Sequence, residues 1–130
     1  MIAVDTSAIV AVIKHEPEEA RIHAALQAAD ISLISTASLL DLQLVLAGRR
    51  ALGIWYEVEL ILREHLIQPR PFDERQLTLA REAAIRYGKG RHRAALNFGD
   101  CFAYALAKSE DIPLLCTGGD FALTDVAIAR

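Results

Sequence analysis

Short apolar segments alternate with longer helix-forming stretches along the sequence, and this alternation limits the possible folds more than any other feature. Strands are expected at 1–4, 31–34 and 113–116. Antiparallel neighbours can be joined by tight hairpin turns, but here helical residues separate the apolar segments. The pattern predicts an α/β fold in which a central parallel sheet is flanked by helices on both faces.

The intervening stretches carry helix start and stop signals. After a polar turn at 5–7, helices are expected over 8–14, 17–29, 54–66, 73–87 and 97–109, with Asp73 and Asn97 as caps. Ser35 or Thr36 is expected to cap a further helix that reaches about residue 51, before a break at Gly53. Residues 69–71, Pro-Arg-Pro, are expected to form an extended connector. No long linker interrupts residues 1–130, which predicts a single domain.

Composition limits the possible functions. Hydrophobic residues make up 53% of the chain, which is enough to fill a core and leave apolar surface for a partner. The net charge of −3 argues against a protein that coats nucleic acid by charge alone. No membrane span, signal peptide or basic leader is recognisable, and Cys101 and Cys116 lack zinc-type or redox-type spacing. A cytoplasmic protein without a membrane partner is expected.

Two aspartates interrupt helical stretches that are otherwise strongly apolar. Asp41 lies several residues inside its helix, and Asp100 lies within the helix that follows Asn97. An unpaired carboxylate is costly to bury, so such positions need an explanation. A location near a helix start could account for Asp100, because the helix dipole favours an acid there, but it does not account for Asp41.

Two further aspartates follow predicted strands. Asp5 comes directly after the first strand, and Asp120 follows the last one. Ligands of open parallel sheets bind outside the carboxyl ends of the strands, which favours a site at that edge. Asp5 could instead simply cap the next helix. Taken together, the four acids favour an active site.

Clustered carboxylates repel one another, so they take up protons or bind cations, and oxygen ligands select Mg²⁺ or Mn²⁺. Such ions can activate water for hydrolysis of a phosphodiester. The sequence lacks a nucleophile elbow, a phosphate-binding glycine loop and a paired zinc motif. A receiver-like domain would need adjacent early acids and a late lysine, and an aspartyl phosphatase would need two acids after the first strand; neither pattern is present.

Four separated segments form a recognisable set of motifs. They are the start Ile-Ala-Val-Asp-Thr-Ser-Ala, the loop Tyr-Gly-Lys-Gly-Arg-His, the segment Leu-Asn-Phe-Gly-Asp-Cys-Phe-Ala-Tyr-Ala-Leu-Ala and the ending Gly-Gly-Asp-Phe-Ala-Leu-Thr-Asp-Val. Together they resemble the PIN-domain nucleases, specifically the VapC-type toxins of bacterial toxin-antitoxin pairs. The resemblance spans essentially the whole chain. It implies a three-layer sandwich, an Mg²⁺- or Mn²⁺-dependent endoribonuclease and inhibition by a cognate antitoxin, with a homodimer and a toxin-antitoxin hetero-oligomer as assemblies.

Transferred position by position, the resemblance makes Asp5 and Asp100 the principal metal ligands. Asp41 takes a helical acid position that is usually glutamate, and it is one methylene shorter. Asp120 completes the acidic set, with Asp125 as the alternative acid.

Other residues are expected to bind the substrate. Thr6 or Ser7 can hold a water molecule or Asp5 itself, and Arg91 and Arg93 of the basic loop can contact RNA phosphates. A PIN-like module that binds RNA or protein without turnover is the alternative function, because of the shortened Asp41.

Overall fold

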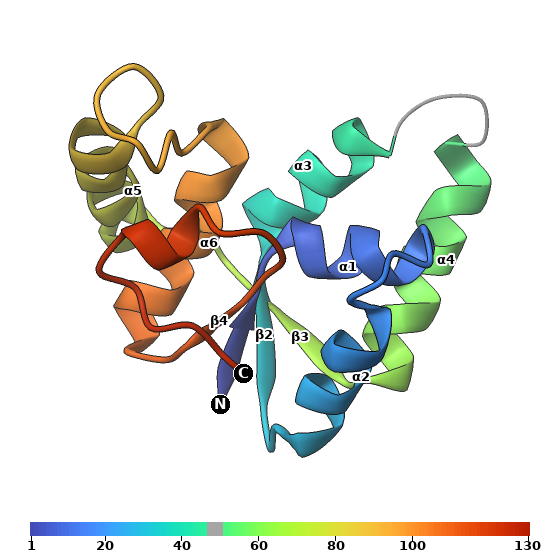
Figure 1. The fold of residues 1–130 in the computed structure, drawn as a ribbon. Helices are drawn as coiled ribbons and strands as arrows, with labels where there is room; N and C mark the ends of the chain where they lie inside the picture. The colour runs from blue at the N-terminus through green and yellow to red at the C-terminus, as the bar shows by residue number, and fades with distance from the viewer. Residues whose placement is uncertain (47–50) are drawn as a thin grey trace.

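A four-stranded parallel sheet forms the centre of the molecule in the computed structural model, which describes residues 1–46 and 51–130 (Figure 1). The strands are β1 (Ile2–Val4), β2 (Ser32–Ser35), β3 (Ile67–Arg70) and β4 (Leu114–Leu115), and their order across the sheet is β3-β2-β1-β4. All three strand pairs are parallel, which confirms the predicted sheet.

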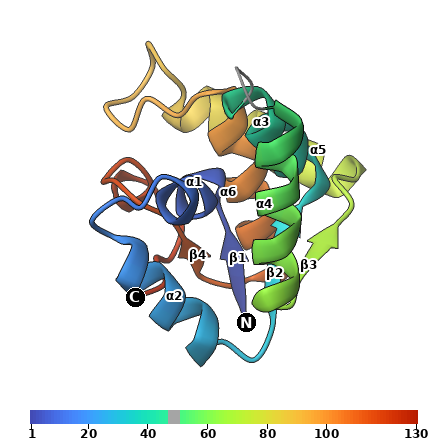
Figure 2. The ribbon, with the colours of Figure 1, turned by 90° about the vertical axis from the view of Figure 1, so that its right-hand side faces the viewer.

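Helices cover both faces of this sheet, as expected. On one face lie α5 (Glu74–Tyr87) and α6 (Phe98–Glu110); on the other lie α1 (Thr6–Ile13), α2 (Glu19–Ala28) and α4 (Ala51–Glu64), which stand in front of the sheet in Figure 2. The helix α3 (Thr36–Val45) extends beyond the carboxyl ends of the strands (Figure 1). No helix in the described part of the chain has the length and apolar character needed to cross a membrane.

Two hydrophobic cores, one on each face of the sheet, follow from the alternation of side chains along each strand. In β1, Ala3 packs into the core beneath α5 and α6, whereas Ile2 and Val4 pack into the core beneath α1, α2 and α4. Leu114 and Leu115 of β4 divide in the same way. The sheet is thus buried on both faces, as parallel sheets generally are.

The two edges of the sheet are protected in different ways. On the β4 side, the N–H of Leu114 donates to the carbonyl of Ala127 at 2.8 Å, and the N–H of Ala129 donates to the carbonyl of Leu114 at 2.9 Å. The C-terminal segment therefore covers the β4 edge. On the other side, Pro69 lies in the edge strand β3, where a missing ladder donor is tolerated.

Local signals explain where the helices at the carboxyl edge begin. The side chain of Asp5 accepts from Ser7 N–H and caps α1, directly after β1. Ser35 ends β2 and caps α3 by accepting from Ala37 N–H. The predicted caps Asp73 and Asn97 are confirmed at α5 and α6. The helix starts of α1 and α3 therefore lie directly at the ends of the two central strands.

Several expected boundaries were wrong. Residues 67–70 form a fourth strand, where a connector was expected at 69–71, because proline is compatible with an edge strand. The helix α1 begins at Thr6 rather than after a turn at 5–7, since Asp5 is already its cap. The helix after Ser35 ends at Val45, and α4 begins at Ala51 and continues through Gly53 without a break. The predicted continuation over 47–50 lies outside the described residues.

Candidate active site

A cavity of about 410 Å³ lies at the carboxyl edge of the sheet, and we call it the acid pocket. It is bounded by the starts of α1 and α6 and by the side of α3. Three of the four expected aspartates line it together. Its polar lining consists of Asp5, Thr6, Ser7, Glu16, Asp41, Asn97, Asp100 and Thr117.

Asp5 is the most deeply buried of these acids, with 2% of its surface exposed. Its Oδ2 accepts a hydrogen bond from the backbone N–H of Ser7 at 3.0 Å, whereas its buried Oδ1 has no hydrogen-bond partner among the described residues. Burial raises the pKa of Asp5 to about 6, and the nearby charge of Asp100 contributes to the increase. The unpartnered oxygen is the kind of buried group that a bound cation would satisfy.

Asp100 belongs to a capping box at the start of α6. The N–H of Asn97 donates to its Oδ2 at 2.9 Å, and the N–H of Asp100 donates to Oδ1 of Asn97 at 2.9 Å. Burial, followed by the charges of Asp120 and Asp41, raises the pKa of Asp100 above its ordinary value. Capping therefore fixes the orientation of Asp100 but leaves it in an electrostatically unfavourable position.

Asp41 projects from α3 towards the start of α6. Its carboxylate lies so close to the Cα of Gly99 that a Cβ at that position would overlap with it. Burial raises the pKa of Asp41, although the residue is only partly buried. The stretch around Asp41 is less enclosed than the sequence suggested, because Leu40 and Leu44 are 64% and 67% exposed. Gly99 is thus the residue that makes room for this acid.

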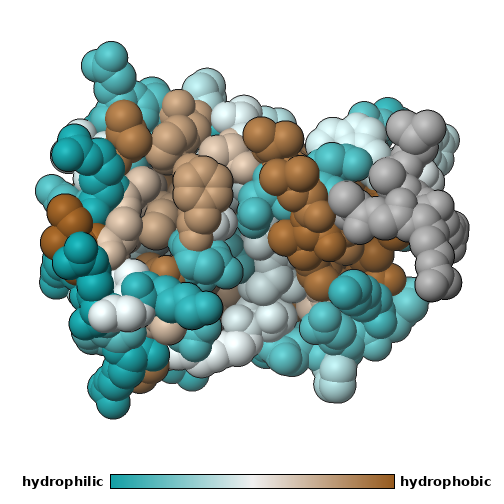
Figure 3. All heavy atoms as spheres, turned by 90° about the horizontal axis from the view of Figure 1, so that it is seen from above, coloured by the Kyte–Doolittle hydropathy of each residue, from teal (hydrophilic) through white to brown (hydrophobic). Residues whose placement is uncertain are grey.

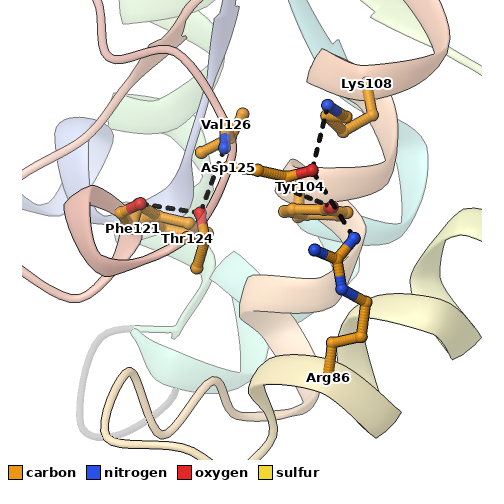
Figure 4. Close-up of polar contacts among 7 residues, drawn as sticks. All are labelled: Arg86, Tyr104, Lys108, Phe121, Thr124, Asp125 and Val126. Atoms are coloured by element: carbon orange, nitrogen blue, oxygen red, sulfur yellow. Dashed lines mark hydrogen bonds and ion pairs between the residues drawn. The ribbon is translucent and has the colours of Figure 1, made fainter.

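Asp120 and Asp125 have different surroundings. Asp120 is exposed and precedes the short 3₁₀ helix η1 (Phe121–Leu123). Its charge raises the pKa of Asp100, although Asp120 does not line the acid pocket. Asp125 faces residues of α5 and α6 (Figure 4). Tyr104 donates to its Oδ1 at 2.6 Å, and Lys108 and Arg86 lie 3.3 and 3.6 Å from its Oδ2.

The ionised state of Asp125 is stabilised where it lies. Burial raises the pKa of Asp125, but the hydrogen bonds from Tyr104 and Lys108 outweigh this effect and hold the pKa below its ordinary value. An acid with three polar partners has little capacity left for another ligand. The geometry therefore favours Asp120 over Asp125 as the fourth acid.

Glu16 is a pocket residue that the sequence analysis did not identify. The chain reverses at His15, whose φ of 52° lies in the left-handed region. The N–H of Glu16 then donates to the carbonyl of Ala11 at 2.9 Å, which returns the residue to the acid pocket. A non-glycine residue in this conformation is uncommon, so no local sequence signal indicated the reversal.

The expected substrate-binding residues fall into two groups. Thr6 and Ser7 line the acid pocket, and the Ser7 hydroxyl accepts from the N–H of Thr117 at 3.0 Å, which ties α1 to the segment after β4. Arg91 and Arg93 are exposed in the loop between α5 and α6 and do not line the acid pocket. The structure therefore does not bring these arginines to the acids.

The acids of the pocket are chemically suited to bind a hard divalent cation. They offer several carboxylate oxygens, and the pKa values of Asp5, Asp41 and Asp100 are raised. In their present rotamers, no three His, Cys, Asp or Glu side chains within the described ranges converge enough to hold a metal ion. The capping bonds of Asp5 and Asp100 direct one oxygen of each acid towards backbone N–H groups. Binding would use the other oxygens, with water in the remaining positions.

Viewed from above, the carboxyl edge has a hydrophilic centre between two apolar areas (Figure 3). One area lies over α3, where Leu40, Leu44 and Val45 are exposed. The other lies on the side of α5 and α6, where Phe98 is 79% exposed. Apolar surface thus flanks the carboxyl edge of the sheet on two sides.

Comparisons with known proteins identify the family of this chain. The PIN domain family model matches residues 2–127. Ribonuclease VapC30 of Mycobacterium tuberculosis is 45% identical over 124 residues, which are 95% of each chain. Mycobacterium tuberculosis VapC20, described as a sarcin-ricin loop cleaving toxin, has a TM-score of 0.74 at 18% identity, over 100% of this chain and 99% of that one.

A toxin-antitoxin complex from Klebsiella pneumoniae contains a chain with the same fold, at a TM-score of 0.71 and 14% identity, over 99% of this chain and 97% of that one. The family assignment rests on the family model and on the 45% identical relative, and both span nearly the full length of this chain. The chain therefore belongs to the PIN-domain family, among the relatives named VapC.

Proposed function

We propose that this protein is an endoribonuclease that depends on Mg²⁺ or Mn²⁺ and acts as the toxin of a toxin-antitoxin pair. The observation that carries the proposal is the acid pocket, where Asp5, Asp41 and Asp100 all have raised pKa values. Asp5 also keeps a buried oxygen without a partner in the described part of the chain. The relatives named VapC ribonuclease support RNA as the substrate.

Each acid has a distinct role in this proposal. Asp5 and Asp100 would hold the cation directly, Asp41 through water because of its shorter side chain, and Asp120 would complete the set from the rim. When bound, the cation lowers the pKa of a water molecule and stabilises charge on the leaving oxygen of the phosphodiester.

Neighbouring residues hold these acids in place. The Ser7 N–H orients Asp5, and the Asn97 N–H orients Asp100. The Ser7 hydroxyl holds the segment around Thr117 against α1. This preorganisation matters because a small displacement of a catalytic group can reduce the rate strongly.

We further propose that residues 1–130 act as one domain in the cytoplasm, with an antitoxin protein as inhibitor and with homodimers as a second assembly. The similarity to a chain of a toxin-antitoxin complex supports the antitoxin. Exposed apolar residues at Leu40 and Leu44 offer surface for such contacts.

A PIN-like module that binds RNA or protein without turnover is the second candidate. It is favoured by the shortened acid Asp41 and by the lack of a convergent ligand triplet among the described residues.

Cleavage of cellular RNA by the purified, antitoxin-free protein separates the two candidates. We expect cleavage with Mg²⁺ or Mn²⁺ that stops on addition of a chelator and is abolished in Asp5→Asn. Equal cleavage by wild type and Asp5→Asn would reveal a contaminating nuclease, and no cleavage with any metal or RNA would favour the binding module.

A further inference from the structure

A second and larger cavity, of about 800 Å³, lies beside the acid pocket between α5 and the start of α6. We call it the aromatic groove, because Phe72, Phe98 and Phe102 line it. Its size lies within the range of small-molecule binding sites. The roles proposed above for the acids leave this groove unexplained.

The three phenylalanines form a connected series. The rings of Phe98 and Phe102 have centroids 4.8 Å apart at 77°, and those of Phe72 and Phe102 lie 5.0 Å apart at 73°. Phe98 ends the series and is 79% exposed. An aromatic ring held from one side and open on the other is a platform on which a planar group can stack.

The groove and the acid pocket are contiguous, because Asn97 and Phe98 line both cavities. Phe98 lies only two residues before Asp100 in the helix that positions that acid. A polymer with a phosphodiester at the acids would therefore pass its neighbouring unit over Phe98.

The cations at the groove favour a polyanion over an apolar peptide. Arg81 and Lys89 line it, are exposed and form no ion pair within the described part of the chain. The carboxylates of the adjacent acid pocket repel phosphates, so binding of RNA needs positively charged residues outside that pocket. Stacking rings combined with unpaired cations are typical of single-stranded nucleic-acid sites.

We propose that the aromatic groove binds an unpaired nucleotide of the RNA beside the cleaved bond, with its base stacked on Phe98 and a phosphate near Arg81 or Lys89. This inference rests on the proposed function, since it assumes that RNA is the substrate. It makes Phe98 a residue of substrate binding rather than of catalysis.

The test measures binding of end-labelled, unstructured RNA oligonucleotides by fluorescence anisotropy, in an Asp5→Asn background that leaves the RNA intact. We expect Phe98→Ala to raise Kd about tenfold, the range of one lost base stack. Phe98→Leu should bind as weakly as Phe98→Ala, because it keeps apolar surface but not the ring, whereas Phe98→Trp should bind like the parent. Tyr56→Ala is the matched control, since Tyr56 is a similarly exposed aromatic residue, at 72%, outside the groove.

Two further arms separate the possible outcomes. An abasic site at the stacked nucleotide should weaken binding to the parent protein but add nothing to Phe98→Ala. Unchanged binding by Phe98→Leu would overturn the proposal. It would also be overturned if sedimentation showed that Phe98→Ala weakens RNA binding only because the variant no longer forms a dimer. Cleavage is measured separately with protein that retains Asp5. Absence of cleavage would contradict the proposed function, whereas the binding measurements would still test the aromatic groove.

Discussion

Asp5 has a buried carboxylate whose ionisation lowers the stability of the folded protein. Its pKa of about 6 lies above the ordinary value of 3.8, mainly because the carboxylate is buried. The unfolded chain ionises more readily, so stability falls as the pH rises from about 4 to about 6, and the full cost applies above that range. Below about pH 4 both states are protonated and the cost disappears.

Asp5→Asn should therefore stabilise the protein in a metal-free buffer at pH 8, by on the order of 1–3 kcal/mol. The amide oxygen can still accept from Ser7, so the helix cap is retained. Thermal or urea unfolding in the presence of chelator measures the difference, which should vanish near pH 4. Added Mn²⁺ should stabilise the wild type but not the variant, because ligands stabilise the state that binds them. A variant that is less stable at pH 8 would contradict this account of Asp5.

Gly99 has a role that follows from the position of Asp41. Gly99→Ala should displace the Asp41 carboxylate and lower RNA cleavage at least tenfold, with little change in stability because alanine favours the helix and Asp41 can move. Gly119→Ala is the control, since a Cβ there meets no atom within 4 Å. Initial cleavage rates and melting temperatures of both variants provide the measurement; equal cleavage by Gly99→Ala and wild type would show that the position of Asp41 is unimportant.

For individual residues, much of the candidate site could be predicted from the sequence. Asp5 and Asp100 were identifiable because strand ends and helix starts leave local signals. The sequence left Asp120 and Asp125 as alternatives, because it could not reveal that the partners of Asp125 come from distant helices. Glu16 was not predictable, because its position depends on a left-handed residue at the end of α1.

Among the larger elements, the C-terminal segment is held by both side-chain and backbone contacts. The Thr124 hydroxyl donates to the carbonyl of Phe121 at 2.7 Å and accepts from the N–H of Val126 at 3.3 Å, which closes the turn after η1 (Figure 4). The hydrogen bond from Tyr104 to Asp125 fastens this turn to α6. The segment that carries Asp120 is thereby fixed beside Asp100.

Tyr104→Phe should lower the free energy of unfolding by about 1–2 kcal/mol, because the Asp125 carboxylate loses its hydroxyl donor. Cleavage should fall less than with Asp100→Asn, since the variant only loosens the segment that carries Asp120. Unfolding curves of Tyr104→Phe, Asp125→Asn and the double variant give the coupling between the two residues. A coupling of zero would show that the hydrogen bond does not hold this segment.

A pair of histidines links α2 to the end of α4. Nδ1 of His23 lies 2.9 Å from Nε2 of His65, and burial, followed by the charge of His23, lowers the pKa of His65. Protonation then favours the unfolded chain, so this contribution to stability is present above about pH 6.5 and is lost as the pH falls.

His65→Gln should therefore flatten the pH dependence of stability between about pH 5 and 8, by less than about 1 kcal/mol because the pair is partly exposed. His15→Gln is the control, since His15 is exposed and, within the described residues, its ion pair is with half-buried Glu19. Both variants are measured in an Asp5→Asn background, because Asp5 changes stability with pH in the direction opposite to His65. Parallel pH profiles for the control and His65→Gln would contradict the role of the pair.

The elements themselves were predicted unevenly. The helices with clear caps, such as the one after Asn97, were located within one or two residues. The strand β3 was missed because two prolines concealed it, and it becomes recognisable only through its pairing with β2. The start of α4 was misplaced because Gly53 is tolerated in a helix that packs against α1.

On the scale of the whole molecule, both cores use the same short sheet, so neither helical layer has an independent interior. We expect a single cooperative unfolding transition in which fluorescence of Trp55 and far-UV circular dichroism coincide. Two separate transitions would contradict the proposed single domain.

The central claim is that carboxylates at one edge of the sheet carry RNA cleavage. The most direct measurement compares initial cleavage rates of Asp100→Asn and Asp125→Asn with wild type, on one RNA with Mn²⁺, at a temperature where all three are folded. The account predicts a loss of at least about a hundredfold for Asp100→Asn, because an amide keeps the capping box but removes a metal-binding charge. Asp125→Asn should retain most of the activity. Comparable rates for Asp100→Asn and wild type, or a larger loss for Asp125→Asn, would contradict the claim.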